Sequence, residues 1–184
     1  MTSVVTITGS PSVPSRSTAL GLHVARQLGA RGMALASINV RELPAAELLA
    51  GRATDPAIAT AVQQIDAADA VVVVTPVYKA AYSGVLKTFL DLLPQFALAG
   101  KVVLPLATGG TLAHVLAIDY ALRPVLAALG ASHVVNGLFV LDKTLAVSDD
   151  RVTLDGDVEQ RLAAIVEEFA RAAELRAAAR APRA

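Results

Sequence analysis

The residues best suited to bind a ligand lie in three short segments, each directly after an apolar run. The first is GSPSVPSRST at residues 9–18, where hydroxyl side chains surround the guanidinium of Arg16. Hydroxyls, an arginine and the free N–H groups of a following helix can together hold a phosphate. The segment lacks the Gly-Lys-Ser/Thr end of a P-loop and the later glycines of a dinucleotide-binding fingerprint. A turn with serine caps is the alternative, but caps alone do not require an arginine, so we favour a phosphate site.

The second segment, PVYKAAYSGVLKTFLD at residues 76–91, supplies aromatic faces and an accessible backbone. Pro76 ends an apolar run, Tyr78 and Tyr82 follow, and Gly84 permits close approach of a ligand. These groups suit a flat ring such as isoalloxazine, which needs stacking and hydrogen bonds to its edge. Two tyrosines that only cover the edge of a sheet would give the same pattern, so the residues alone leave both interpretations open.

The third segment, ATGGT at residues 107–111, places Gly109 and Gly110 before a helical pattern. Adjacent glycines can turn tightly and present N–H groups to the edge of a flavin, where negative charge develops on reduction. A simple strand-to-helix turn has the same composition, and two glycines do not decide between the two.

The composition argues against several other chemistries. There is no cysteine, which removes disulfides, thiolate nucleophiles and thiolate metal sites. His23, His114 and His133 are scattered, without the spacing of metal ligands or a Ser-His-Asp signature. Sixteen basic residues balance sixteen acidic ones, so nothing attracts nucleic acid or an anionic membrane. The sequence shows no signal peptide and no long apolar run, so we expect a cytoplasmic protein. From the cysteine and histidine patterns we expect no metal site and no side chain that reacts in catalysis.

Apolar runs of strand length alternate with longer stretches of helical period, and this alternation predicts what positions the three segments. The predicted strands cover residues 4–8, 34–40, 70–75, 102–107 and 134–140. The predicted helices cover residues 17–32, 84–93, 112–129 and 157–179, and a further helix begins at Asp55-Pro56. Residues 144–156 are polar and are expected to form an outward loop, and residues 180–184 a frayed tail.

Five strands alternating with five helices predict one α/β domain over residues 1–179, with a parallel sheet. Right-handed crossovers leave few topologies, and the flavodoxin-like order 2-1-3-4-5, a three-layer sandwich, suits five strands best. In such a sheet, ligands bind beyond the carboxyl ends of the strands. All three segments lie at those ends, so they are expected to carry the function.

The sequence also resembles a known family. PVYKAAYSGVLKTFLDLLP resembles the signature of the NADPH-dependent FMN reductases, and GSPS-x-x-SRST resembles their phosphate loop. HVLAIDYALRPVLAALGA, residues 114–131, is similar to the subgroup that supplies reduced FMN to alkanesulfonate monooxygenases. The resemblance implies FMN and NADPH as cofactors, hydride transfer to a reversibly bound flavin, and a flavin-dependent monooxygenase as partner.

The resemblance further implies which residues contact the flavin, in three groups. Phosphate contacts are implied for Ser10, Arg16, Ser17 and Thr18. Ring contacts are implied for Pro76, Val77, Tyr78 and Lys79, with Ser83 and Gly84 nearby. Contacts to the flavin edge are implied for Thr108, Gly109 and Gly110.

Two other functional classes remain open. An enzyme with tightly bound FMN that reduces quinones or azo compounds would share this fold and the same three segments. A flavodoxin-type electron carrier would share them too. Such carriers tend to be strongly acidic for docking, however, and this chain has no net charge.

The fourth predicted helix gives two further signals. Its apolar residues exceed what one sheet face requires, which predicts a homodimer or homotetramer. Pro124 has no N–H and crowds the carbonyl of Tyr120, and the apolar rows on either side of residues 119–120 are out of phase. A plain kink or a π-bulge that takes up one residue can satisfy both observations. The resemblance implies an inserted aromatic near the flavin and a subunit interface, so we expect Tyr120 to be that insertion and to keep reduced flavin releasable.

Overall fold

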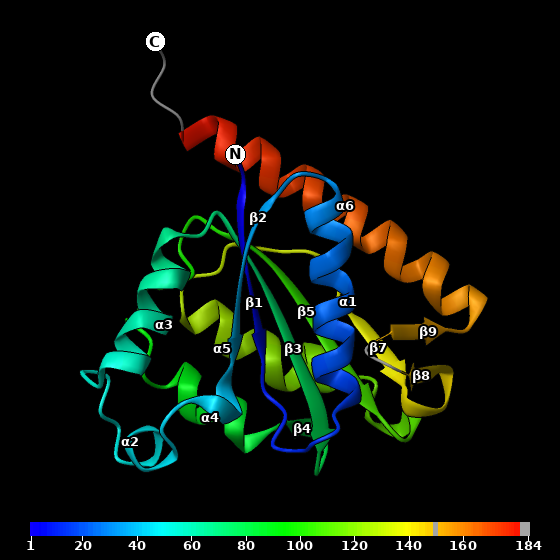
Figure 1. The fold of residues 1–184 in the computed structure, drawn as a ribbon, viewed down its shortest axis with the longest axis horizontal. Helices are drawn as coiled ribbons and strands as arrows, with labels where there is room; N and C mark the ends of the chain where they lie inside the picture. The colour runs from blue at the N-terminus through cyan, green and yellow to red at the C-terminus, as the bar shows by residue number, and fades with distance from the viewer. Residues whose placement is uncertain (149–150, 181–184) are drawn as a thin grey trace.

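The computed structural model describes residues 1–148 and 151–180, and a parallel sheet forms its centre (Figure 1). Its first four positions are, in spatial order, β2 (Ala34–Asn39), β1 (Ser3–Thr8), β3 (Ala70–Tyr78) and β5 (Val102–Gly109). The last position beside β5 is shared by two short strands, β6 (His133–Val134) and β7 (Leu138–Leu141). The predicted order 2-1-3-4-5 is therefore confirmed, with the fifth strand in two pieces.

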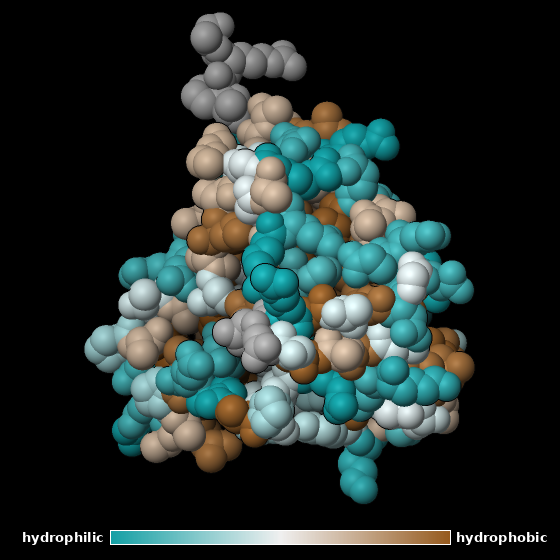
Figure 2. All heavy atoms as spheres, turned by 45° about the vertical axis from the view of Figure 1, so that its right-hand side comes forward, coloured by the Kyte–Doolittle hydropathy of each residue, from teal (hydrophilic) through white to brown (hydrophobic). Residues whose placement is uncertain are grey.

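Helices cover both faces of the sheet and complete a three-layer sandwich (Figure 1). One face carries α1 (Arg16–Ala30) and α6 (Gly156–Arg180). The other carries four shorter helices, α2 (Ala45–Leu49), α3 (Pro56–Ala67), α4 (Gly84–Leu90) and α5 (Arg123–Ala128). Hydrophilic and hydrophobic residues are intermixed over the side of the molecule that Figure 2 shows. Among the described residues, no helix is both long and apolar enough to cross a membrane.

The residues of β3 show why the sheet forms. Val72 and Val74 pack into the core beneath α1 and α6, whereas Val71 and Val73 pack into the core on the opposite face. Branched side chains fit a pleated strand, and a strand that is apolar on both faces belongs in the middle of a parallel sheet. At the carboxyl end of this strand Pro76 is still buried, and the chain emerges from the core at Val77 and Tyr78.

The break in the fifth strand has a local cause in β5. The carbonyl of Val103 accepts a hydrogen bond from the N–H of Val135. Backbone groups two residues apart in a strand point to the same side, so the backbone nitrogen of Pro105 also faces the fifth strand. Proline has no N–H to donate, and the ladder is interrupted beside it. A Cβ on Gly137 would lie 2.6 Å from the Pro105 carbonyl oxygen, so only glycine fits there. The guanidinium of Arg123 donates to the freed carbonyl of Val135 at 2.9 Å.

The helix predicted over residues 112–129 is not continuous, which corrects the prediction. The segment begins as a 3-10 turn (Leu112–His114), passes through a π-helix, η3 (Ile118–Leu122), and becomes regular in α5. The N–H of Arg123 donates to the carbonyl of Ile118, five residues back, as a π-helix requires. The π-bulge is therefore confirmed over a plain kink, and Pro124 stands where α5 begins.

The outward loop predicted over residues 144–156 is wrong. β8 (Leu145–Ser148) and β9 (Arg151–Leu154) pair as an antiparallel hairpin. Leu145 and Leu154 face each other across it and are only 3% and 8% exposed, packed in the core beneath α1 and α6. These two apolar anchors, with Val152 packed against the same core, therefore hold the segment on the molecule. Of the predicted tail, Arg180 ends α6, and residues 181–184 lie outside the described residues.

Candidate functional site

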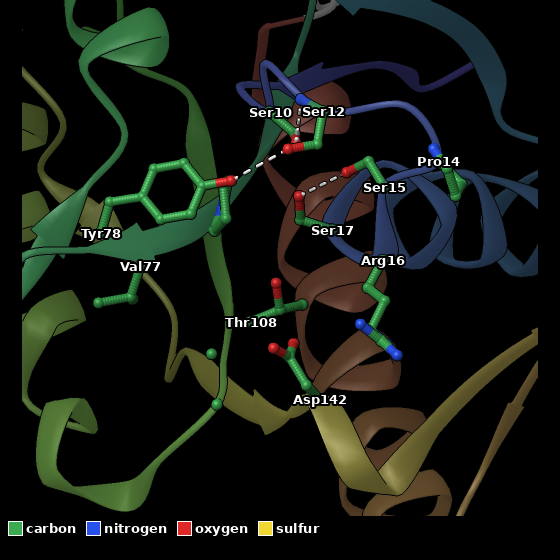
Figure 3. A pocket seen from close by; sticks show the side chains of 13 residues that line it. Ser10, Ser12, Pro14, Ser15, Arg16, Ser17, Val77, Tyr78, Thr108 and Asp142 are labelled. Carbon is green, nitrogen blue, oxygen red and sulfur yellow. Dashed lines mark hydrogen bonds between the residues drawn. The ribbon is translucent and has the colours of Figure 1, made fainter.

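A cavity of about 320 Å³ lies at the carboxyl edge of the sheet and brings the three predicted segments together (Figure 3). Nine residues of the implied flavin site line it: Ser10, Arg16, Ser17, Pro76, Val77, Tyr78, Thr108, Gly109 and Gly110. The four others, Thr18, Lys79, Ser83 and Gly84, do not line it. Four further residues complete the wall: Ser12, Pro14, Ser15 and Asp142.

The loop before α1 has the features of an anion site. The hydroxyl of Ser15 caps the helix by accepting a hydrogen bond from the N–H of Thr18 at 3.1 Å, and it lies 3.1 Å from the hydroxyl of Ser17. The first-turn N–H groups of a helix have no intrahelical carbonyl, so those of Arg16 and Ser17 are available to a ligand. Arg16 is exposed and forms no ion pair with any described residue. The positive end of the helix dipole adds to its charge.

Two buried hydroxyls lie deeper in this loop. Ser10 is 2% exposed, and its hydroxyl accepts a hydrogen bond from the N–H of Ser12 at 3.2 Å, which folds the loop back on itself. The hydroxyl oxygen of Thr18 is buried and has no hydrogen-bond partner among the described residues. A buried polar group without a partner is costly, so this hydroxyl favours a ligand with an acceptor nearby.

The second segment turns back on itself beside the cavity. β3 continues into a tight hairpin with β4 (Ala81–Tyr82), and Lys79 and Ala80 at its tip have left-handed φ angles of 50° and 66°. Tyr78 is 44% exposed, and its phenol oxygen lies 3.3 Å from the hydroxyl of Ser12 across the cavity (Figure 3). Tyr82 packs against the core, and burial raises the pKa of its phenol, which therefore stays neutral. Only the first of the two predicted tyrosines faces the cavity.

Ser83 holds two of the segments in place rather than facing the cavity. Its buried hydroxyl donates to the carbonyl of Gly9 and accepts from the N–H of Leu86 at 3.0 Å, which caps α4. Its own N–H donates to the hydroxyl of Thr75 at 3.0 Å. These bonds connect the phosphate loop, the end of β3 and α4. Gly84, next in sequence, is exposed, and a Cβ there would meet nothing within 4 Å.

The two glycines of the third segment differ in their surroundings. A Cβ on Gly109 would lie 2.7 Å from the ring of Phe139, so packing explains this glycine. A Cβ on Gly110 would meet only the carboxylate of Asp142, at 3.9 Å, so the space before this glycine is open to a ligand. Gly110 therefore fits the predicted edge contact better than its neighbour does.

Asp142 is the residue of the cavity that the sequence did not indicate. It directly follows β7, which lies beside β5, so its carboxylate reaches the same sheet edge as Thr108 and Gly110. In Figure 3 it faces the side chain of Arg16 across the lower part of the cavity. The signal available in the sequence was an acidic residue directly after the fifth strand.

Two cations near the sheet, Lys87 and Arg123, are engaged outside the cavity. Lys87 forms an i,i+4 ion pair with Asp91 at 2.8 Å, and the hydrogen bond to that carboxylate raises the pKa of Lys87. Arg123 pairs with Asp119 at 2.8 Å in addition to its bond to the fifth strand. Neither cation lines the cavity, so both serve the fold.

The strand order, a helix N-terminus with hydroxyls and an arginine, and aromatic and glycine loops at one edge define a flavodoxin-like nucleotide-binding protein. A model of the NADPH-dependent FMN reductase family matches residues 2–146. The chain belongs to that family, and it is an oxidoreductase of the FMN reductase type, with FMN and NADPH as cofactor and reductant.

Individual relatives agree with this membership. The chain is 46% identical over 166 residues to an FMN reductase (NADPH) of Escherichia coli, covering 90% of this chain and 87% of that protein. It is 49% identical over 146 residues to an FMN reductase (NADPH) of Pseudomonas putida, covering 79% and 74%. Among solved structures, the apo form of an NADH:FMN oxidoreductase matches with a TM-score of 0.86 and 40% identity, covering 94% of this chain and 90% of that one.

Proposed function

We propose that this enzyme reduces FMN with NADPH and releases the reduced flavin to a separate flavin-dependent monooxygenase of sulfonate sulfur assimilation. The observation that carries the proposal is the cavity in which the phosphate loop, Tyr78 and the loop from Thr108 to Gly110 meet. Family membership supports the reaction. The resemblance of residues 114–131 to the sulfonate subgroup supports the partner.

The residues of the cavity suit the two ends of FMN. The hydroxyls of Ser10 and Ser17, the free N–H groups at the start of α1 and the Arg16 guanidinium would hold the phosphate. Thr18 lies in the same first turn but outside the cavity wall, so of this residue only the backbone, whose N–H bonds to Ser15, would support the set. The flat ring would lie between the hairpin at Tyr78 and the open space before Gly110. Bound FMN supplies the hydride acceptor for the nicotinamide.

The side chains of this chain bind and orient rather than react. The cavity wall contains no cysteine, histidine or lysine, and its hydroxyls already serve as caps and loop contacts. Positioning alone accelerates a reaction between two bound molecules, because it replaces a chance encounter with a fixed geometry. N–H groups near Thr108–Gly110 would stabilise charge at the flavin edge.

Release of the reduced flavin is the part of the proposal that concerns η3. Tyr120 lies in this π-helix and is 79% exposed, which suits a residue inserted at a surface. π-helical turns often occur at functional sites, because the extra residue changes side-chain direction. We propose that Tyr120 is the inserted aromatic and that it keeps FMN exchangeable. Lys79, Ser83 and Gly84 would act from outside the cavity wall, through the hairpin and α4.

Steady-state oxidation of NADPH with and without added FMN, FAD and riboflavin tests the reaction. We expect little oxidation without flavin and the fastest oxidation with FMN. Stopped-flow kinetics tests release: reduced FMN should leave between turnovers, and a ping-pong pattern with flavin that never dissociates would count against the proposal.

The colour of the purified protein distinguishes the proposed function from the main alternative, a reductase that binds FMN tightly. A protein that exchanges FMN should be isolated colourless. Protein that stays yellow through purification and reduces quinones or azo compounds faster than free FMN would instead be a tightly flavin-bound reductase.

A further inference from the structure

A second cavity, of about 520 Å³, adjoins the flavin cavity on the side of the β8–β9 hairpin. The two cavities share Pro14, Ser15, Arg16 and Asp142, so Arg16 and Asp142 stand at the boundary between them. The outer wall of the second cavity comes from the short turn after β7 and from β8. A ligand there would touch the phosphate end of the flavin site directly. Nothing in the proposed flavin contacts uses this outer wall.

The outer wall presents one cation on a fixed backbone. Lys143 lies in the 3-10 turn η4 (Asp142–Thr144), which the hydroxyl of Thr144 closes by donating to the carbonyl of Leu141 at 2.9 Å. The next residue, Leu145, is buried in the core. Lys143 itself is exposed and forms no ion pair with any residue that the structure describes. Its backbone is therefore fixed beside the cavity, and its ammonium group is free to meet an anion.

Charge and apolar surface together indicate the kind of ligand. Arg16 and Lys143 carry two positive charges in the wall and Asp142 one negative charge, which leaves the cavity cationic. Ala146 and Val147 on β8 add exposed apolar surface, which can pack against a ribose or a purine. Lysine binds phosphate as a point charge, and a nearby carboxylate can accept hydrogen bonds from sugar hydroxyls. This combination suits a phosphorylated nucleoside.

A neighbouring cavity on the other side of the phosphate loop is less suitable. It is lined by Arg41 and Glu42, whose charges cancel, and by Asn39. The Arg41 guanidinium already donates to the carbonyl of Ser12 at 3.5 Å, and the amide of Asn39 donates to the Glu42 carboxylate at 2.6 Å. Its one cation, Arg41, already has a hydrogen-bond partner, so this cavity offers no free cation to a second phosphate.

We propose that the cavity between the phosphate loop and β8 binds the adenosine 2′-phosphate part of NADPH, with Lys143 contacting the 2′-phosphate. The inference rests on the proposed function, because hydride transfer requires the reductant to lie against the bound flavin. If NADPH extends from the flavin ring beside Tyr78 past Arg16, its adenosine end would lie in this cavity. Lys143 would then determine the preference for NADPH over NADH.

The direct test is binding of adenosine 2′,5′-bisphosphate, measured by calorimetry on protein saturated with FMN. The parent should bind it, and Lys143→Gln should weaken binding by about fivefold or more, the effect of losing one charged contact to phosphate. Adenosine 5′-monophosphate lacks the 2′-phosphate and should bind both proteins similarly. Lys87→Gln, which removes a lysine paired with Asp91 outside both cavities, is the matched control and should bind like the parent.

Kinetics gives a second readout. In Lys143→Gln the KM for NADPH should rise by about the same factor, while the KM for NADH should change much less. Equal affinity of the parent and Lys143→Gln for the bisphosphate would overturn the proposal, as would competition between the bisphosphate and FMN for one site. Calorimetry needs no turnover, so it tests the binding site independently of catalysis. A protein that fails to reduce FMN would refute the proposed function, whatever the calorimetry shows.

Discussion

At the scale of single residues, the structure separates side chains that line the cavity from side chains that shape the loops around it. Arg16 extends into the cavity from the start of α1, whereas Ser83 is buried among backbone groups behind it. Both were implied as flavin contacts by resemblance. Their surroundings predict that substituting Arg16 changes the affinity for FMN, whereas substituting Ser83 changes the stability of the fold.

Replacing Arg16 with alanine should weaken FMN by about 1.5–3 kcal/mol, the range for hydrogen bonds to charged groups. Riboflavin has no phosphate, so its affinity should change much less. Fluorescence titration with both flavins measures the two effects, and Arg52→Ala, which removes an exposed arginine paired with Glu47, is the control. An equal loss of affinity for both flavins would refute the phosphate assignment.

Replacing Ser83 with alanine should lower the free energy of unfolding by about 1–3 kcal/mol. The variant loses the cap of α4 and leaves the buried carbonyl of Gly9 without its donor. Urea denaturation monitored by circular dichroism measures the change. Ser132→Ala, at an exposed serine with no side-chain hydrogen bond to the described residues, should change stability little. A Ser83→Ala protein as stable as the parent would show that these bonds contribute nothing net.

At the scale of elements, the segment from Leu112 to Ala128 is the least regular part of the fold. It changes from a 3-10 turn to a π-helix to an α-helix within one connection. Pro124 cannot donate a helical hydrogen bond, and the π-helix places the extra residue directly before α5. The π-helix before α5 therefore follows from one proline and one additional residue.

Deleting Tyr120 should restore a regular register over this connection. We expect the deletion variant to retain FMN through purification, visible as flavin absorbance, and to turn over free FMN slowly. Tyr120→Ala keeps the insertion while removing the aromatic ring, so it separates the register from the side chain. A deletion variant that folds, is isolated colourless and reduces free FMN at the parental rate would contradict this role.

At the scale of the whole molecule, exposed apolar residues gather where the fold is irregular. Residues 112–120 include four that are at least 44% exposed: Leu112, Val115, Leu116 and Tyr120. Apolar groups that do not pack within the chain indicate an interface. We predict that a second copy of this chain covers them.

Light scattering at micromolar concentration should therefore give the mass of a dimer or tetramer, with and without FMN. Leu116→Glu should shift the protein toward the monomer, because it buries a charge in the apolar contact. Leu175→Glu, at a leucine 68% exposed on α6, is the control and should leave the mass unchanged. A parent protein that is monomeric under both conditions would rule the assembly out.

The sequence by itself determined the sheet and the edge of it at which the cavity lies. Continuous apolar runs such as AVVVVT identify buried parallel strands, because period and burial are local properties of the chain. Once the strands were assigned to a parallel sheet, their common direction required their carboxyl ends to share an edge. The three candidate segments follow those ends, and nine of the thirteen implied contact residues line one cavity.

Only the tertiary structure decided which side chains face that cavity. Ser83 turns away from the cavity to donate to the Gly9 carbonyl, and Tyr82 turns away to pack into the core on the face that carries α2 to α5. Both partners come from distant parts of the chain. Asp142 enters because β7 lies beside β5, and the hairpin β8–β9 forms because Leu145 and Leu154 find a shared core. The direction of a side chain depends on contacts between residues far apart in sequence, which local pattern does not record.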